Sequence, residues 1–158
     1  MQTENRIVIF APAGRVFALG AAIDAWPRIL PHYRWVRVLS DDGRVKQAEM
    51  AARRDAFPVR WRTSQVVLPE ENRIVFFHTG GVTRGRYVEW TLSPTVVDGR
   101  NGVSVTISHD LSFPLPLLTD WFARHVVGGY FVHDIAGRTL ARIKEIAESE
   151  AGDAAFGK

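Results

Sequence analysis

His109 stands in a sequence pattern that suits proton transfer. Val103, Val105 and Ile107 alternate with polar residues just before it, which predicts a β-strand with one apolar face, and His109 has the parity of that face. Burial disfavours a charged imidazolium, and a neutral imidazole can accept or donate a proton near neutral pH. We interpret His109 as a general acid–base group. A core histidine that is hydrogen-bonded to a neighbour fits the same pattern, so both interpretations stay open.

The neighbouring strands add further polar and aromatic side chains to the same interior. By the same alternation, the inward-facing candidates for ligand contact are Trp61, Thr63, Gln65, Phe76, His78, Arg86, Trp90 and Ile107. Arg84 shares the parity of Arg86. The Arg86 cation could polarise a carbonyl, or it could lie at the pocket mouth with its charged end in water. Trp61 and Trp90 could form a platform for a ligand or simply belong to the core.

Several other kinds of site are excluded by composition and spacing. The chain has no cysteine, which excludes disulfides, iron–sulfur clusters and cysteine-based zinc sites. The five histidines show no HxxxH spacing, and no G-x-S-x-G motif is present. The run Gly80–Gly85 lacks the lysine and spacing of a P-loop and lies between predicted strands. We therefore expect neither a metal site nor a cofactor.

The charge pattern argues against nucleic acid as a partner. The net charge is +3, from 17 arginines and three lysines set against 17 acidic residues. The arginines are scattered and interleaved with acids, whereas nucleic-acid-binding proteins concentrate their positive charge on one face. No apolar run approaches the length of a membrane span, and the polar N-terminus leads into too short an apolar run for a signal peptide. We expect a cytoplasmic protein with no integral membrane contact.

The elements that must position these side chains follow from hydrophobic periodicity. Period-two patterns predict seven strands, the last six forming an antiparallel meander. Their expected ranges are Arg6–Ala11, Trp35–Leu39, Val45–Arg54, Phe57–Leu68, Arg73–His78, Arg84–Ser93 and Val103–Phe113. Turns are expected at 41–43, Gly80-Gly81 and 98–102. The inward face of Val45–Arg54 is ambiguous, because either Glu49, Ala51 and Arg53 or Ala48, Met50 and Ala52 could point inward; the apolar set is favoured.

Helical spacing frames the meander at both ends. A short helix is expected over about 12–22 with Pro12 in its first turn, and a second one is expected to be capped by Asp24 and ended by Pro31. A long helix is expected over about 117–150, with an apolar stripe that includes Ile135. Gly128-Gly129 is a weak point of this helix, and together with Gly80-Gly81 it is expected to form the mobile rim of an entrance.

These elements predict a single α+β domain spanning residues 1–158. A curved antiparallel sheet of about seven strands wraps around the long C-terminal helix, and two short helices follow the first strand. The helix must bury its stripe against the concave face of the sheet. We expect an apolar cavity between the two, lined by Trp90, Ile107, His109 and Ile135.

Three segments resemble one known superfamily. Ile7–Phe17, Asp24–Tyr33 and Gly137–Lys144 are similar to the START/Bet v 1-like superfamily, which has the helix-grip fold, and within it to the polyketide cyclase/dehydrase and coenzyme Q-binding branch. The resemblance implies that Trp26 and Tyr33 approach the pocket. It also implies that His109 corresponds to the histidine that some family members use on the last long strand before the helix. The arginine of related aromatase/cyclases falls near Gln65–Val67, where no arginine faces inward, so Arg86 would have to substitute.

The resemblance implies two main functions from different classes. The first is a cyclase, aromatase or dehydratase acting on a polyketide-like chain, with His109 transferring protons and Tyr33 or Arg86 polarising a carbonyl. The second is a non-catalytic carrier of a quinone, lipid or other apolar ligand. A third, an interaction protein similar to ribosome-binding relatives, is disfavoured by the scattered charge. Expected partners are an apolar small molecule, a second copy in a homodimer and, in a polyketide pathway, an acyl carrier protein.

Overall fold

The computed structural model describes residues 2–81, 83–110 and 129–156. One antiparallel sheet holds seven strands in the order β1-β7-β6-β5-β4-β3-β2. The strands are β1 (Gln2–Ile9), β2 (Tyr33–Asp41), β3 (Val45–Arg54), β4 (Phe57–Leu68), β5 (Arg73–Gly81), β6 (Tyr87–Val97) and β7 (Arg100–Asp110). The helices are α1 (Ala13–Ala21), α2 (Trp26–Ile29) and α4 (Gly129–Phe156), with 3-10 turns η1 (Ile23–Ala25) and η2 (Pro69–Glu71). This is the predicted helix-grip fold.

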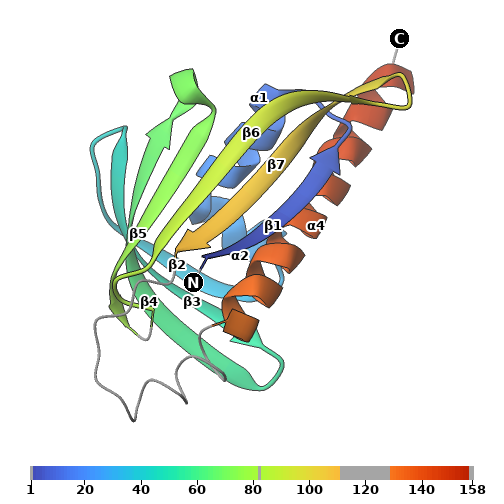
Figure 1. The fold of residues 1–158 in the computed structure, drawn as a ribbon. Coiled ribbons are helices and arrows are strands. Elements are labelled where there is room, and N and C mark those ends of the chain that lie inside the picture. The colour runs from blue at the N-terminus through green and yellow to red at the C-terminus, as the bar shows by residue number, and fades with distance from the viewer. Residues whose placement is uncertain (1, 82, 111–128, 157–158) are drawn as a thin grey trace.

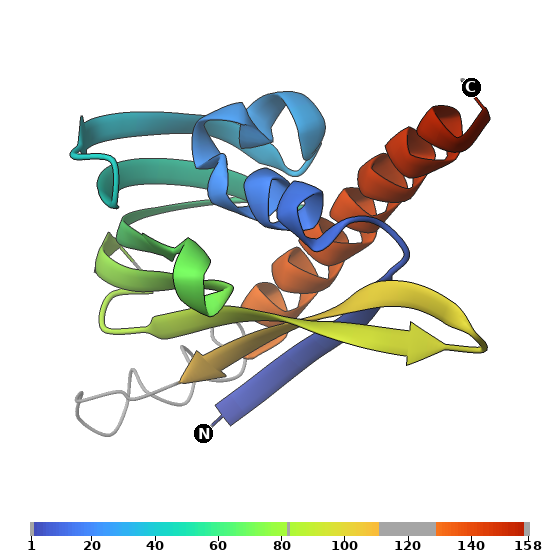
Figure 2. The ribbon, with the colours of Figure 1, turned by 90° about the horizontal axis from the view of Figure 1, so that it is seen from above.

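Helix α4 lies on the inner side of the curved sheet because one of its faces is apolar. Ile135, Leu140, Ile143 and Ala147 repeat at helical spacing and are all buried. Figures 1 and 2 show α4 running beside β1 and crossing the hollow of the sheet, with α1 and α2 nearby. Polar contacts tie its C-terminal half to β1, where Lys144 Nζ donates a hydrogen bond to the Val8 carbonyl at 2.7 Å.

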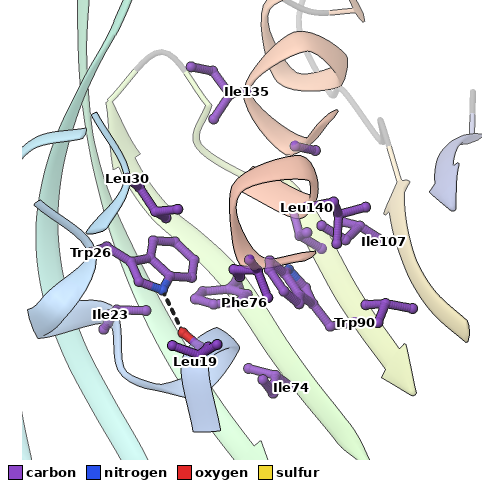
Figure 3. Packing of buried hydrophobic residues seen from close by; sticks show 14 of the residues in the cluster. Leu19, Ile23, Trp26, Leu30, Ile74, Phe76, Trp90, Ile107, Ile135 and Leu140 are labelled. Carbon is purple, nitrogen blue, oxygen red and sulfur yellow. Dashed lines mark hydrogen bonds between the residues drawn. The ribbon is translucent and has the colours of Figure 1, made fainter. Parts of the chain in front are cut away.

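The short helices pack closely against the sheet. Pro12 is the N-cap of α1, so its missing N–H costs no intrahelical hydrogen bond. A Cβ atom on Gly20 would lie 3.0 Å from the Trp90 ring, so a glycine there lets α1 approach β6. Trp26 in α2 donates its indole N–H to the Leu19 carbonyl at 3.0 Å, as Figure 3 shows. These contacts hold the two short helices over one end of the core.

Strand alternation predicted the buried faces correctly. Val103, Val105, Ile107 and His109 on β7 are buried, as are Val88, Trp90 and Leu92 on β6. On β5 and β4 the buried sets are Ile74, Phe76 and His78, and Trp61, Thr63 and Gln65. Ala48, Met50 and Ala52 of β3 belong to the core cluster. Glu49 points to the other face, where its carboxylate accepts a hydrogen bond from Arg62 at 2.9 Å. The apolar alternative for β3 is therefore confirmed.

The turn predicted at Gly80-Gly81 is wrong, because both residues belong to β5. A register shift between Arg62 and Thr63 of β4 leaves Thr79 of β5 without a paired residue in β4, which marks a β-bulge. Gly81, which pairs with Trp61, has φ +82°. The turn follows at Thr83–Gly85. Arg84 therefore lies in that turn and is exposed, instead of sharing the buried side of Arg86.

Other predicted boundaries shift for identifiable reasons. Asp98 and Gly99 have φ +50° and +75°, so a two-residue turn joins β6 to β7 and both strands run further than predicted. β1 begins at Gln2, because its polar first residues pair with β7. β2 spans Tyr33–Asp41 in place of Trp35–Leu39. Asp24 does not cap α2: it lies inside η1, and the N-cap of α2 is Ala25.

The long helix is confirmed over its described part. α4 begins at Gly129 and continues to Phe156, a few residues past the predicted end near 150. Residues 111–128 lie outside the described residues. They include the predicted end of the last strand at 111–113 and the predicted first part of the helix at 117–128, with Gly128. The stripe on α4 thus positions Ile135 against the sheet as predicted.

Candidate functional site

A cavity of about 70 Å³ lies between α4 and the concave face of the sheet. It is lined by Trp26, Tyr33, Met50, Trp61, Phe76, His78, Thr83, Val88, Trp90, Ile107, His109, Ile135, Ala136 and Thr139. The predicted lining of Trp90, Ile107, His109 and Ile135 is confirmed. The elements that enclose the cavity are thus α2, α4, the strands from β2 to β7 and the turn that carries Thr83.

Aromatic rings form one wall of the cavity. The Trp26 ring centroid lies 4.9 Å from that of Tyr33 and 6.0 Å from those of Phe76 and Trp90. Figure 3 shows Trp26, Phe76 and Trp90 side by side beneath the first turns of α4, although they come from α2, β5 and β6. Such a wall offers flat apolar surface to a ring system.

Two histidines form the more polar end of the cavity, with His78 two residues past Phe76 on β5. His78 Nδ1 lies 2.7 Å from the Thr83 hydroxyl, and its ring stacks on Trp61 with centroids 6.0 Å apart. His109, opposite Val88 in the sheet, is 2% exposed. Its Nδ1 atom is buried and has no hydrogen-bond partner among the described residues. A buried polar atom of this kind on a cavity wall is suited to receive a ligand.

The polar end keeps its histidines neutral. Burial and the nearby Arg86 guanidinium lower the pKa of His109 to about 4 and that of His78 to about 3. Burial also lowers the pKa of Arg86, to about 10, so Arg86 remains cationic at neutral pH. A fixed positive charge therefore lies close to two uncharged imidazoles. Such an arrangement favours negative charge that develops on a ligand near His109.

A second polar group crosses the cavity wall between α4 and β2. Tyr33 and Thr139 both line the cavity, and burial raises the pKa of the Tyr33 phenol. The Thr139 hydroxyl also lies 2.9 Å from His32 Nε2 and donates to the Ile135 carbonyl at 2.8 Å. Burial lowers the pKa of His32 to about 4, with the Arg138 charge adding to the effect. Tyr33 thus enters the cavity as a neutral phenol.

Three predicted site residues do not line the cavity. Gln65 donates its amide to the Ala21 carbonyl at 3.0 Å, and Thr63 donates its hydroxyl to the Phe77 carbonyl at 3.2 Å. Both side chains are buried away from the cavity wall, Gln65 against α1 and Thr63 within the sheet. Arg86 is buried but is absent from the cavity wall, so it acts on the site through its charge. The other predicted residues, Trp26, Tyr33, Trp61, Phe76 and His78 included, do line it.

Five lining residues were missed. Met50 and Val88 belong to the predicted inward sets, so parity could have found them. Ala136 and Thr139 flank Ile135 on α4, where the helical stripe widens toward the cavity. Thr83 lies in a turn, and no periodic pattern points a turn residue inward.

The cavity is smaller than a ligand pocket. Its volume is about 70 Å³, which is roughly twice the volume that a water molecule occupies in the liquid. Pockets for organic ligands span roughly 300–1,000 Å³. Within the described residues, no cluster of His, Asp or Glu side chains could hold a metal ion. No helix in the described ranges is both long and apolar enough to cross a bilayer.

Comparisons with known proteins agree with this geometry. Residues 9–128 match the profile of a family described as polyketide cyclase/dehydrase and lipid transport. Among curated proteins, none matches the chain significantly.

Solved structures share the fold at low sequence identity. TTHA0849 from Thermus thermophilus superposes with a TM-score of 0.74 at 19% identity, covering 95% of this chain and 99% of that one. The Zhui aromatase/cyclase from Streptomyces sp. R1128 gives 0.70 at 14% identity, covering 97% and 94%. The di-domain aromatase/cyclase StfQ from the steffimycin biosynthetic pathway gives 0.73 at 15% identity. The match covers 96% of this chain and 51% of StfQ, so the chain corresponds to about half of that protein.

Proposed function

Because the chain belongs to the polyketide cyclase/dehydrase and lipid transport family, we propose that it binds a polyketide-like chain in the cavity, whose walls move apart to admit it, and catalyses ring closure with loss of water. The observation that carries the proposal is His109: a buried imidazole on the cavity wall whose Nδ1 has no hydrogen-bond partner in the described part of the chain. An uncommitted neutral imidazole is the group that such chemistry needs.

Ring closure by an aldol reaction requires one proton to leave carbon and one to reach oxygen. Neutral His109 accepts a proton from a CH₂ group that lies between two carbonyls. The resulting enolate carbon then attacks a different carbonyl, further along the same chain. The imidazolium then returns its proton to the new alkoxide. In the dehydration, His109 removes the next carbon-bound proton and protonates the departing hydroxyl, so that one water leaves and His109 ends neutral.

The neighbouring groups lower the energy of the enolate. The Tyr33 phenol, neutral because burial raises its pKa, donates a hydrogen bond to the carbonyl oxygen on which charge develops. The cationic Arg86, close enough to lower the pKa of both His78 and His109, stabilises the same charge from behind the wall. The aromatic wall of Trp26, Phe76 and Trp90 holds the chain folded so that its two reacting carbons meet.

The experiment measures product formation from an aromatic polyketide mimic by the parent and by His109→Gln. We expect turnover to fall by roughly 10²–10⁴-fold, the usual contribution of a general acid–base group. Ser108→Ala is the matched control, because Ser108 is adjacent on β7 and lies on the other face of the sheet; it should keep full turnover. Equal rates for parent and His109→Gln, with both proteins folded by circular dichroism, would remove His109 from catalysis.

A carrier of an apolar ligand is the second candidate function. It is favoured by the lining itself, in which aromatic and aliphatic side chains predominate and can bind an apolar molecule without any reaction. Native mass spectrometry of freshly purified protein tests it by detecting a co-purified apolar ligand. Tight binding with no turnover in the parent would favour the carrier. The homodimer and the acyl carrier protein partner stay predictions.

A further inference from the structure

A surface groove of about 510 Å³ lies where α4 passes the end of β3 and the residues just before β2. Arg138 and Arg142 of α4 line it together with Arg53, the next-to-last residue of β3. His32 also lines it, and its Nε2 atom lies 2.9 Å from the hydroxyl of Thr139 in the cavity wall. The groove is therefore adjacent to the cavity, and unlike the cavity it has the volume of a pocket for an organic ligand.

The groove has more positive than negative charge. Its lining includes three arginines but only two acidic residues, Asp55 and Glu145. His32 adds no charge at neutral pH, because burial and the nearby Arg138 charge lower its pKa to about 4. Arg138 and Arg142 lie four residues apart on α4, so their like charges repel each other. An anion between the two guanidinium groups offsets this repulsion.

The two helix arginines are held in position by contacts outside the groove. Arg142 Nε donates a hydrogen bond to the Ile29 carbonyl at 3.1 Å, and Arg138 Nε lies 3.0 Å from the Asp134 carboxylate. Arg53 is exposed and forms no ion pair with the part of the chain that the structure describes. Because a guanidinium has five N–H donors, each of the three arginines keeps donors for a ligand.

The two acidic residues of the groove are held only weakly. Asp55 lies 3.8 Å from Arg138 and its side chain is 76% exposed. Glu145 lies 2.9 Å from Arg142 and its side chain is 69% exposed. Ion pairs this exposed contribute little to stability, so both carboxylates can turn into solvent when a stronger anion arrives.

We propose that this groove is a binding site for the phosphate group of a phosphate ester. A phosphate monoester carries nearly two negative charges and three acceptor oxygens at neutral pH, whereas each resident carboxylate carries one charge. The phosphate displaces Asp55 and Glu145 for this reason. Its oxygens then accept hydrogen bonds from Arg53, Arg138 and Arg142, whose planar guanidinium groups match phosphate geometry. The rest of the groove holds the organic part of the ester. The site does not depend on the proposed cyclase activity.

The test is a titration with glycerol 3-phosphate at constant ionic strength, followed by the backbone amide shifts of the protein in NMR spectra. We expect saturation with a Kd of about 1 mM or lower. Arg53→Gln and Arg142→Gln should each weaken binding by about tenfold or more. Glu145→Gln should strengthen it by a few fold, because a competing carboxylate is removed. The amides of the groove should shift more than those of the cavity wall.

Arg44→Gln is the matched control. Arg44 pairs with Glu70 on the surface and does not line the groove, so this variant loses the same charge and should keep the parent Kd. Binding that Arg44→Gln weakens as much as Arg53→Gln does would overturn the site, because it would reflect net charge alone. Since the Arg53 side chain makes no ion pair, Arg53→Gln should stay folded even where Arg142→Gln does not.

Vesicles of phosphatidylcholine, with and without phosphatidic acid, separate the two sources of a phosphate ester. Sedimentation with the acidic vesicles that is lost in Arg53→Gln would assign the groove to a lipid head group. Saturation by glycerol 3-phosphate without vesicle binding would assign it to a soluble ester. Either result supports the site, and the absence of binding in both would overturn it, whether or not the protein has cyclase activity.

Discussion

Gln65 illustrates how a residue can face the interior without belonging to the site. Its side chain is completely buried, and its amide N–H is donated to the Ala21 carbonyl at the end of α1. Gln65 therefore joins β4 to α1 and lies outside the cavity wall. The inward polar groups of this sheet differ in what they contact: some hold elements together, and others, such as His109, face the cavity.

Replacing Gln65 by Leu should destabilise the fold and leave the cavity intact. The Ala21 carbonyl would lose its buried partner, which we expect to lower the free energy of unfolding by about 1–3 kcal/mol. Urea denaturation measures this change, and titration with an apolar ligand checks that affinity is retained. A protein of parent stability that no longer binds the ligand would show instead that Gln65 contacts it.

At the residue scale, periodicity predicted most of the site. Ile107 and His109 were placed correctly because side chains in a strand alternate strictly between two faces. Parity predicted correctly that Arg86 is buried. It could not show that Arg86 lies outside the cavity wall, because distance from the cavity depends on how the sheet curves. Thr83 escaped because it lies in a turn. Thr139 escaped because a threonine on a helix gives no signal until its partner His32 is known.

At the scale of elements, the end of β5 depends on one glycine. Gly81 has φ +82°, and a Cβ atom built there would lie 2.4 Å from the Arg60 carbonyl oxygen of β4. Gly80, its neighbour, has ordinary space: its Cβ would lie 3.5 Å or more from the Arg62 side chain. Gly81 ends β5 just before the turn that carries Thr83 to the cavity wall.

The pair Gly81→Ala and Gly80→Ala should separate strain from the simple loss of glycine. We expect Gly81→Ala to lower the free energy of unfolding by more than about 1 kcal/mol, because alanine tolerates neither the positive φ nor the contact. Gly80→Ala should change it by less than about 0.5 kcal/mol. Thermal unfolding by circular dichroism measures both; equal effects would contradict the assignment of strain to Gly81.

The glycine pair also explains why this boundary could not be predicted. Two consecutive glycines indicate a turn as readily as a bulge, because both need unusual backbone angles. The choice depends on the register of β4, where Arg62 and Thr63 shift relative to β5. That register is set by pairing between strands, which the local sequence does not contain. The turn at Asp98-Gly99 lay within the range predicted for it, because Asp-Gly is typical of a hairpin.

At the scale of the whole molecule, buried histidines link folding to acidity. The pKa values of His78 and His109 lie at about 3 and about 4, well below the 6.5 of an exposed histidine. Below pH 6.5 these two histidines bind protons in the unfolded chain, whereas in the folded chain they stay neutral until the pH approaches their lower pKa values. Stability therefore falls as the pH drops from about 6.5 toward about 4, by up to about 1.4 kcal/mol per pH unit for each of these two groups.

We expect the free energy of unfolding to be clearly lower at about pH 5 than at about pH 7. His109→Gln should show a shallower dependence on pH over this interval, because one of the contributing groups is gone. Urea denaturation of both proteins at several pH values measures the two slopes. A parent protein whose stability is constant between these pH values would show that its histidines titrate normally.

The stacking of Trp26 on Trp90, at 6.0 Å and 28°, has an optical consequence. Two indoles this close share their excited states, so the pair should give a strong near-ultraviolet circular dichroism signal that depends on their mutual angle. Both rings lie in the cavity wall, and a cavity of about 70 Å³ cannot admit a multi-ring compound unless they move. The chain therefore carries its own spectroscopic reporter, in which occupancy of the cavity is read as a change in exciton coupling and indole emission without any added label.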